Sequence, residues 1–196
     1  MTSPSLTSAH RAHAFAAFAL SALALIAAPL AHAADYVQAP GSVLTFATEY
    51  QGEVFVGRFP TFDTRISFDP AQPQAGTLDV TIRLAGADTD NIERDETLQG
   101  ADFFNVARFP QARYTARGFR KLDGNRYAAD GTLELRGVSK PVTLTFEWTP
   151  GARPVLAGKA TVSRLAHNVG GGDWADTELL PDAVAVSTRV NLQPAK

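Results

Sequence analysis

Alternation of apolar and polar side chains restricts the fold of this chain more than any other feature of its sequence. The clearest case is residues 77–84, Thr-Leu-Asp-Val-Thr-Ile-Arg-Leu, in which every second side chain is apolar. This period of two is typical of β-strands with one buried face. The same pattern recurs at residues 44–50, 66–68, 127–135, 142–148, 156–162 and 184–192, and around Tyr114. The pattern predicts eight or nine strands.

Short polar turns separate these segments, as in Asp123-Gly124-Asn125 and Thr149-Pro150-Gly151. Strands joined by such turns pair antiparallel, and their single apolar face must be buried. Closing the sheet into a barrel buries that face and removes exposed edges. A two-sheet sandwich fits the pattern as well, and between the two we favour the barrel.

One segment departs from the alternation. Asp90 followed by Glu93 resembles a capping box, so we expect a short helix from Asp90 to about Leu98 that ends at Gly100. An aromatic loop at residues 102–110 follows this helix. We expect the helix and the loop to cover one mouth of the barrel.

The first 33 residues have the layout of a secretory signal peptide. A weakly basic start precedes an apolar run at residues 14–28, and Ala31-His32-Ala33 matches a cleavage signature. A membrane anchor is the alternative, but the run is shorter than the roughly 20 residues that a spanning helix needs. We expect cleavage after Ala33, export to the periplasm and a mature domain at residues 34–196, in which no segment is long and apolar enough to span a membrane.

Composition removes several classes of chemistry. The absence of cysteine excludes disulfides, thiolate metal sites and cysteine nucleophiles. A formal charge of −2 gives no basic face for nucleic acid. Only His167 remains after leader removal, and the chain holds no serine-nucleophile elbow or phosphate-binding loop. We therefore expect no cofactor, no metal and no enzymatic activity. A hydrolase or isomerase that depends on His167 is kept only as a third hypothesis, after the two binding functions given at the end of this section.

Small residues gather on the predicted inner face of three strands. They are the pairs Ala116 and Gly118, Ala129 and Gly131, and Gly158 and Ala160. They could leave an elongated apolar pocket, or the glycines could simply relieve strand curvature. The predicted pocket walls are Phe46, Phe68, Val80, Ile82, Tyr114, Ala116, Gly131, Leu133, Leu144, Phe146 and Trp148. If the pocket is real, Gly131→Leu or Ala116→Leu should block ligand uptake and preserve the fold.

Four residues are candidates for the pocket mouth: Arg94, Phe103, Phe104 and Trp174. Arg94 lies between two acids in Glu93-Arg94-Asp95. A structural ion pair that holds the helix is one interpretation of Arg94, and contact with an anionic head group is the other.

Several short motifs, taken in order, resemble the YceI-like family. They lie at residues 57–59, 68–70, 93–98, 102–104, 109–110, 131–133 and 136–144, within a resemblance that covers about residues 36–192. The resemblance implies a lipocalin-like antiparallel barrel, usually periplasmic, whose interior takes a long isoprenoid chain. Residues 172–176 look like a variant found fused or adjacent to membrane b-type cytochromes.

We therefore expect a periplasmic carrier of a polyisoprenoid or isoprenoid quinone that performs no covalent chemistry. The alternative is a non-catalytic interaction module that partners a membrane b-type cytochrome or another envelope protein through residues 164–182. The oligomeric state is not indicated by the sequence.

Overall fold

The computed structural model describes residues 34–196 together with Met1. The predicted signal peptide therefore lies, apart from Met1, outside the described residues. The described residues form ten strands and one α-helix, in the order β1 Ala34–Gln38, β2 Val43–Tyr50, β3 Glu53–Arg58, β4 Phe62–Phe68, β5 Thr77–Arg83, α1 Ile92–Gln99, β6 Gln111–Lys121, β7 Arg126–Leu135, β8 Val138–Thr149, β9 Val155–Ser163 and β10 Ala183–Pro194. Four short 3-10 turns lie at Pro73–Ala75, Leu84–Gly86, Leu165–His167 and Gly172–Trp174.

The sheet closes into an eight-stranded antiparallel barrel. The strands follow the order β1-β4-β5-β6-β7-β8-β9-β10, and pairing of β1 with β10 completes the ring. β10 is long enough to pair with β1 near its end and with β2 near its start. β3 then adds to the outer edge of β2. The predicted barrel is confirmed, with a β2–β3 hairpin as an addition.

The sequence pattern did not predict β3, and the burial of its side chains explains why. Val54 and Val56 point outward and are 73% and 57% exposed, whereas Phe55 is partly buried. Apolar residues therefore occupy both faces of β3, and the alternation that marks a half-buried strand is absent.

A β-bulge in β6 changes which residues face the interior. The β6–β7 register shifts between Ala116 and Phe119, and Gly118 takes a positive φ of 73° at the bulge. A glycine adopts this backbone conformation without steric cost. Gly118 was predicted on the inner face, but the extra residue moves the inward position to Phe119, which is 1% exposed.

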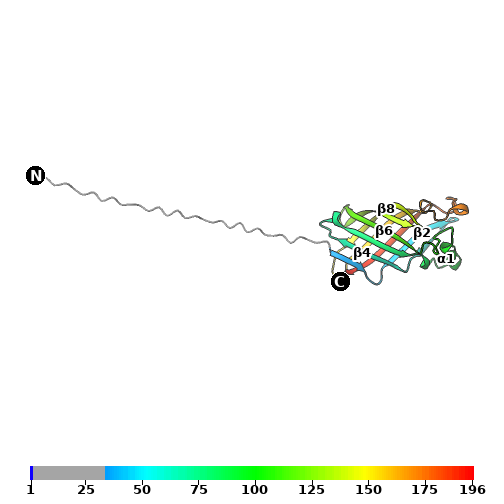
Figure 1. Cartoon of the computed structure of the whole chain (residues 1–196), viewed down its shortest axis with the longest axis horizontal. Coiled ribbons are helices and arrows are strands. Elements are labelled where there is room, and N and C mark those ends of the chain that lie inside the picture. The colour runs from blue at the N-terminus through cyan, green and yellow to red at the C-terminus, as the bar shows by residue number, and fades with distance from the viewer. Residues whose placement is uncertain (2–33) are drawn as a thin grey trace. The chain divides into compact units, whose positions relative to one another are not determined.

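The helix α1 lies where the sequence predicted it and begins at a different cap. The Asn91 side chain accepts a hydrogen bond from the Arg94 amide, so Asn91 is the N-cap instead of Asp90. Asp90 has a left-handed backbone and its carboxylate pairs with Arg58 at 3.0 Å, so it is not available as the cap. Figure 1 shows α1 at one end of the barrel and the C-terminus at the other.

The two ends of the barrel differ. Inward-facing aromatic rings fill the end opposite α1, and we call this set the aromatic plug: Tyr36, Phe68, Phe119, Tyr127, Phe146 and Trp148. Its ring centroids lie 4.8–5.9 Å apart, within the range of favourable aromatic contacts. At the other end, residues 84–110 and 164–182 cover the barrel, and we call these the mouth segments. The Gly170 amide donates to the Asp102 carbonyl at 2.7 Å and joins the two segments.

Candidate functional site

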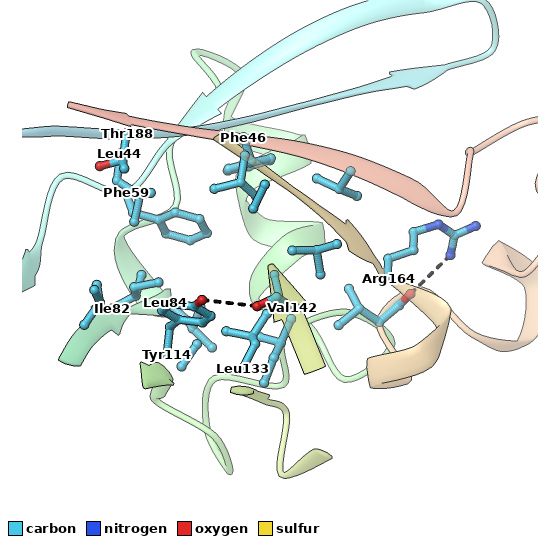
Figure 2. A pocket seen from close by; sticks show the side chains of 18 of the residues that line it. Leu44, Phe46, Phe59, Ile82, Leu84, Tyr114, Leu133, Val142, Arg164 and Thr188 are labelled. Atoms are coloured by element: carbon cyan, nitrogen blue, oxygen red, sulfur yellow. Dashed lines mark hydrogen bonds between the residues drawn. The ribbon is translucent and has the colours of Figure 1, made fainter. Parts of the chain in front are cut away.

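An apolar cavity of about 200 Å³ lies inside the barrel (Figure 2). This volume exceeds tenfold the roughly 10–15 Å³ that one water molecule requires. Its walls are side chains from each of the nine strands β2 to β10, together with residues of the mouth segments. The aliphatic and aromatic residues among them include Leu44, Phe46, Phe55, Phe59, Leu78, Leu84, Leu98, Leu135, Val142, Leu156, Ala160, Val162, Val184, Val186 and Val190.

Six of the predicted wall residues line this cavity: Phe46, Val80, Ile82, Tyr114, Leu133 and Leu144. They come from five strands, β2, β5, β6, β7 and β8. Their inward direction follows from the alternation that predicted them. The cavity thus brings together residues that are up to 98 positions apart in the sequence.

The other five predicted wall residues lie elsewhere. Phe68, Phe146 and Trp148 belong to the aromatic plug, where Phe68 and Phe146 are each 1% exposed. Ala116 and Gly131 pair with each other across β6 and β7 and do not line the cavity. Alternation gives the face of a strand on which a side chain lies, and it carries no information about depth along the barrel.

Gly131 is small because Tyr114 needs the space. A Cβ atom at Gly131 would lie 2.5 Å from Tyr114 Cζ and Oη and 2.6 Å from the Thr115 carbonyl oxygen. Real Cβ atoms do not approach other atoms this closely. The sequence interpretation that Gly131 leaves room for a ligand is therefore corrected: a side chain of the protein already fills that room.

The hydroxyl of Tyr114 lies within hydrogen-bond distance of two backbone carbonyls. Its single proton is shared between the Ala129 carbonyl at 2.7 Å and the Val142 carbonyl at 3.1 Å, and Figure 2 shows the second contact. Burial raises the pKa of Tyr114 to about 12, so the hydroxyl keeps its proton at physiological pH. Tyr114 presents its ring to the cavity and directs its polar atom into the barrel wall.

The predicted mouth residues separate into two groups. Phe103 and Phe104 are buried and line the cavity. Trp174 packs on the ring of Phe103 at 5.2 Å and on Tyr50 at 6.0 Å, one layer further out. The Trp174 side chain does not line the cavity itself.

Arg94 stabilises the start of α1. Its Nε donates to Thr89 Oγ1 at 2.9 Å, and its guanidinium lies 4.2 Å from the centroid of the Phe55 ring. Asp95 accepts from the Thr89 amide and hydroxyl at 2.8 and 2.6 Å. Arg94 and Asp95 both bind Thr89, so Arg94 has a structural role at the start of α1. The ion pair that the sequence suggested is not formed: the five salt bridges of the described residues do not include Arg94.

Arg164 was missed as a lining residue by the sequence analysis. It is 3% exposed, and it is the one charged residue among the described residues of the cavity lining. All five of its N–H groups donate to backbone carbonyls of residues 169–181, at 2.5–3.1 Å. Burial lowers the pKa of Arg164, and the nearby Asp182 partly offsets this effect. Arg164 fixes the second mouth segment over the cavity.

Three threonines are the remaining polar residues of the cavity lining besides Tyr114 and Arg164. Thr188 Oγ1 donates to the Val43 carbonyl at 2.9 Å. Thr48 Oγ1 and Thr64 Oγ1 are buried without a hydrogen-bond partner among the described residues. Their inward position follows the alternation of β2 and β4, in which Thr64 stands between the buried Phe62 and Ile66.

His167 is a core residue. The residue is 1% exposed, and Nδ1 lies 3.0 Å from the Val138 carbonyl oxygen. Burial lowers its pKa, so the neutral form is favoured. Among residues 34–196 the structure holds no group of three or more side chains that could ligate a metal ion. No helix in this part of the chain is long and apolar enough to cross a membrane.

A closed antiparallel barrel with a plugged end, a covered mouth and an apolar interior defines a lipocalin-like class of protein. Residues 36–193 match the profile of the YceI-like domain. The chain therefore belongs to the YceI-like family.

Curated relatives and solved structures agree with this membership. A UPF0312 protein of Photorhabdus laumondii is 36% identical over 127 residues, which is 63% of this chain and 66% of the relative. Protein YceI of Escherichia coli O157:H7 is 38% identical over 124 residues, 61% of this chain and 64% of the relative. The chain thus matches slightly less than two thirds of the length of each.

Two solved structures share the fold. BcnA of Burkholderia cenocepacia superposes with a TM-score of 0.74 at 27% identity, covering 76% of this chain and 95% of BcnA. A polyisoprenoid binding domain from Saccharophagus degradans superposes with a TM-score of 0.65 at 18% identity, covering 84% of this chain and the whole of that domain.

Proposed function

We propose that this chain binds a long apolar lipid of isoprenoid type inside the barrel and carries it without covalent chemistry. The supporting observation is the cavity of about 200 Å³ with its apolar walls. A permanently empty space of this size would cost on the order of 5 kcal/mol at roughly 24 cal/mol per Å³. An apolar ligand removes this cost, and transfer of its own surface out of water adds to the stabilisation.

The two ends of the barrel favour a ligand that enters from the mouth. The aromatic plug closes one end with tightly packed rings, while the cavity reaches the mouth segments at Leu98, Phe103 and Leu180. A flexible hydrocarbon chain can enter such a cavity through the mouth and cover its apolar walls. The Saccharophagus degradans domain with the same fold is described as binding a polyisoprenoid, which agrees with this choice of ligand.

We also propose a periplasmic location, on the basis of the expected signal peptide at residues 1–33. Mass measurement of the protein from a periplasmic fraction checks this. The expected mature chain begins at Ala34, and a chain that retains residues 1–33 in the cytoplasm contradicts the proposal.

The proposed absence of catalysis rests on where the candidate base lies. His167 is buried and hydrogen-bonded to the barrel wall, and it does not line the cavity. A hydrolase or isomerase assay on bound lipid, with His167→Ala as the comparison, should show no turnover in either protein.

The alternative function is a non-catalytic interaction module in which the second mouth segment contacts a partner such as a membrane b-type cytochrome or another envelope protein. The observation that favours it is the exposure of Leu179, at 46%, beside Tyr50, at 36%. Leu179→Asp should weaken binding to such a partner and leave lipid affinity unchanged. Equal binding by both proteins would remove this candidate.

A chain-length series tests the lipid proposal directly. Ligand efficiency for molecules of this size is about 0.3 kcal/mol per non-hydrogen atom, so each five-carbon prenyl unit should add about 1.5 kcal/mol, or roughly tenfold in affinity. Affinity for prenyl alcohols should rise by this factor per unit and then level off when the cavity is full. Affinity that does not depend on chain length contradicts the proposal.

A matched pair of variants on β9 locates the ligand. Ala160 lines the cavity, whereas Ala157 on the same strand lies outside the lining. Ala160→Leu should place three additional carbons in the cavity and shorten the chain length at which affinity levels off. Ala157→Leu should leave that length unchanged. The same chain-length limit in both variants would show that the lipid binds elsewhere.

A further inference from the structure

A second pocket, open to solvent, lies outside the barrel interior, between the end of β2 and the second mouth segment. Its volume is about 310 Å³, and its lining residues are Tyr50, Asp173, Trp174, Asp176, Leu179 and Leu180. The Gln51 amide donates to the Leu179 carbonyl at 2.9 Å and joins the two sides. Figure 1 shows the mouth-segment side, in orange, at the end of the barrel that carries α1. The pocket thus combines aromatic rings, carboxylates and aliphatic side chains in one small space.

Two aromatic rings line this pocket. The ring centroids of Tyr50 and Trp174 lie 6.0 Å apart, and their planes are inclined by 49°. Trp174 also packs on Phe103 at 5.2 Å, so its indole is held against the covered mouth. Tyr50 is 36% exposed, so part of its ring remains accessible to a ligand. The faces of tyrosine and tryptophan rings attract cations.

Asp173 and Asp176 bring negative charge to the pocket without a compensating cation. Neither acid takes part in the five salt bridges of the described residues. Arg164 is the one cation within residues 164–182 apart from the neutral His167, and its five N–H groups all donate to backbone carbonyls. One carboxylate oxygen of Asp176 accepts from the Glu178 amide at 2.8 Å. The charge of the pocket therefore favours a cation over a neutral or anionic ligand.

The residue types of the pocket favour an organic cation over a metal ion. The described part of the chain contains no group of three or more side chains that could hold a metal ion. A calcium ion takes six to eight oxygen ligands, whereas organic ammonium groups are recognised by aromatic rings. The remaining lining residues, Leu179 and Leu180, offer apolar contact to the carbon substituents of such a group.

We propose that this pocket binds an organic ammonium group, with Tyr50 and Trp174 against the cation and Asp173 and Asp176 on its negative side. The site lies outside the barrel cavity, and the proposal does not depend on the lipid-binding function proposed above. Leu180 lines both spaces, so the bound ammonium group lies next to the covered mouth. The ammonium belongs either to a free amine or to a lipid head group, and the experiment below separates these sources.

The two tryptophans of the chain allow this site to be observed directly by NMR. In a titration with choline, the indole N–H signal of Trp174 should shift and saturate. The signal of Trp148, which is 3% exposed in the aromatic plug, should stay in place. The neutral control is the choline analogue in which a tert-butyl group replaces the trimethylammonium group. A Trp174 signal that does not move in choline, or that moves equally with the neutral analogue, overturns the proposal.

Substitutions at Tyr50 test the role of the ring. Tyr50→Phe keeps an aromatic face and should bind choline as the unsubstituted protein does. Tyr50→Leu should weaken binding about two- to fivefold, the fold-change expected for one cation–π contact at an exposed site. An unchanged Trp148 signal shows that each variant keeps its fold. Equal affinities of Tyr50→Phe and Tyr50→Leu would mean that the ring does not contact the cation, and the proposed arrangement fails.

A matched pair of charge variants separates a local carboxylate from the overall charge of the mouth. Asp173→Asn should weaken choline binding, because it removes one carboxylate of the pocket. Glu93→Gln on α1 changes the net charge of the chain equally and lies outside the pocket, so it should leave the affinity unchanged. If both variants weaken binding equally, the mouth attracts cations only through its overall charge, and the site is overturned.

Vesicle sedimentation identifies the source of the ammonium group. Sedimentation with phosphatidylcholine vesicles that free choline prevents indicates a lipid head group. A saturable choline shift without sedimentation indicates a free amine, and either result supports the site. Sedimentation with phosphatidylglycerol vesicles, which carry no ammonium group, should be weaker than with phosphatidylcholine vesicles. Equal or stronger sedimentation with phosphatidylglycerol would contradict recognition of an ammonium group.

Discussion

Gly131 offers a sharp test of how tightly the barrel wall is packed. In Gly131→Ala the new Cβ would lie 2.5 Å from Tyr114 Cζ and Oη and 2.6 Å from the Thr115 carbonyl oxygen. That carbonyl belongs to the paired strand β6, so relief of this contact disturbs the β6–β7 pairing. The ring of Tyr114 must move as well, and its hydroxyl then loses its contact with the Ala129 and Val142 carbonyls.

The expected cost follows from these contacts. Overpacking of this kind costs about 1–3 kcal/mol. Loss of the hydrogen bond that the Tyr114 hydroxyl donates adds about 0.5–1.5 kcal/mol. We therefore expect Gly131→Ala to lower the free energy of unfolding by about 1.5–4.5 kcal/mol, a large part of the roughly 5–15 kcal/mol that stabilises a typical domain. Gly131→Leu adds more atoms to the same collision and should unfold the protein instead of only blocking the ligand.

Gly171→Ala is the matched control, because a Cβ at Gly171 would meet nothing within 4 Å and its φ is −83°. Both substitutions reduce the entropy of the unfolded chain by a similar amount, so that effect cancels in the comparison. Denaturant unfolding monitored by circular dichroism measures the difference. A difference below about 0.5 kcal/mol between the two variants would refute the packing argument.

Three further predictions follow from buried polar groups. Arg164→Gln leaves several backbone carbonyls without a donor and should lower the free energy of unfolding, measured in denaturant, by at least about 3 kcal/mol. The surface variant Arg113→Gln is the control, and a smaller loss for Arg164→Gln than for this control would contradict the role of Arg164. Tyr114→Phe should cost about 1–3 kcal/mol in the same assay, and an unchanged stability would show that its hydroxyl contributes nothing. Burial lowers the pKa of His167 below its ordinary 6.5, so the unfolded chain binds the proton more readily. Stability should therefore fall as the pH drops below about 6.5, by at most about 1.4 kcal/mol per pH unit from this group, and this contribution to the slope should disappear in His167→Asn.

The alternation of residues predicted the barrel because a strand with one buried face must repeat every second residue. It also predicted that Phe46, Val80 and Tyr114 face the interior. What it could not supply is depth along the barrel axis, since that depends on strand register and stagger. Phe68 and Phe146 share the inward phase and lie in the aromatic plug, below the cavity.

The sequence contained a signal for two polar lining residues that the analysis of alternation did not use. Thr48 and Thr64 stand on the inward phase of apolar strands, and a polar residue in that position marks a candidate polar site. Arg164 carried no such signal. Its burial depends on carbonyls that residues 169–181 bring around it, and no local pattern encodes this arrangement.

Native mass spectrometry of the protein purified from the cells that produce it tests the central claim most directly. Organic extraction of the same sample then identifies any bound molecule. We expect a mass excess that matches one isoprenoid lipid. A protein without bound lipid, whose mass also stays unchanged after incubation with prenyl quinones and prenyl alcohols, would contradict the account.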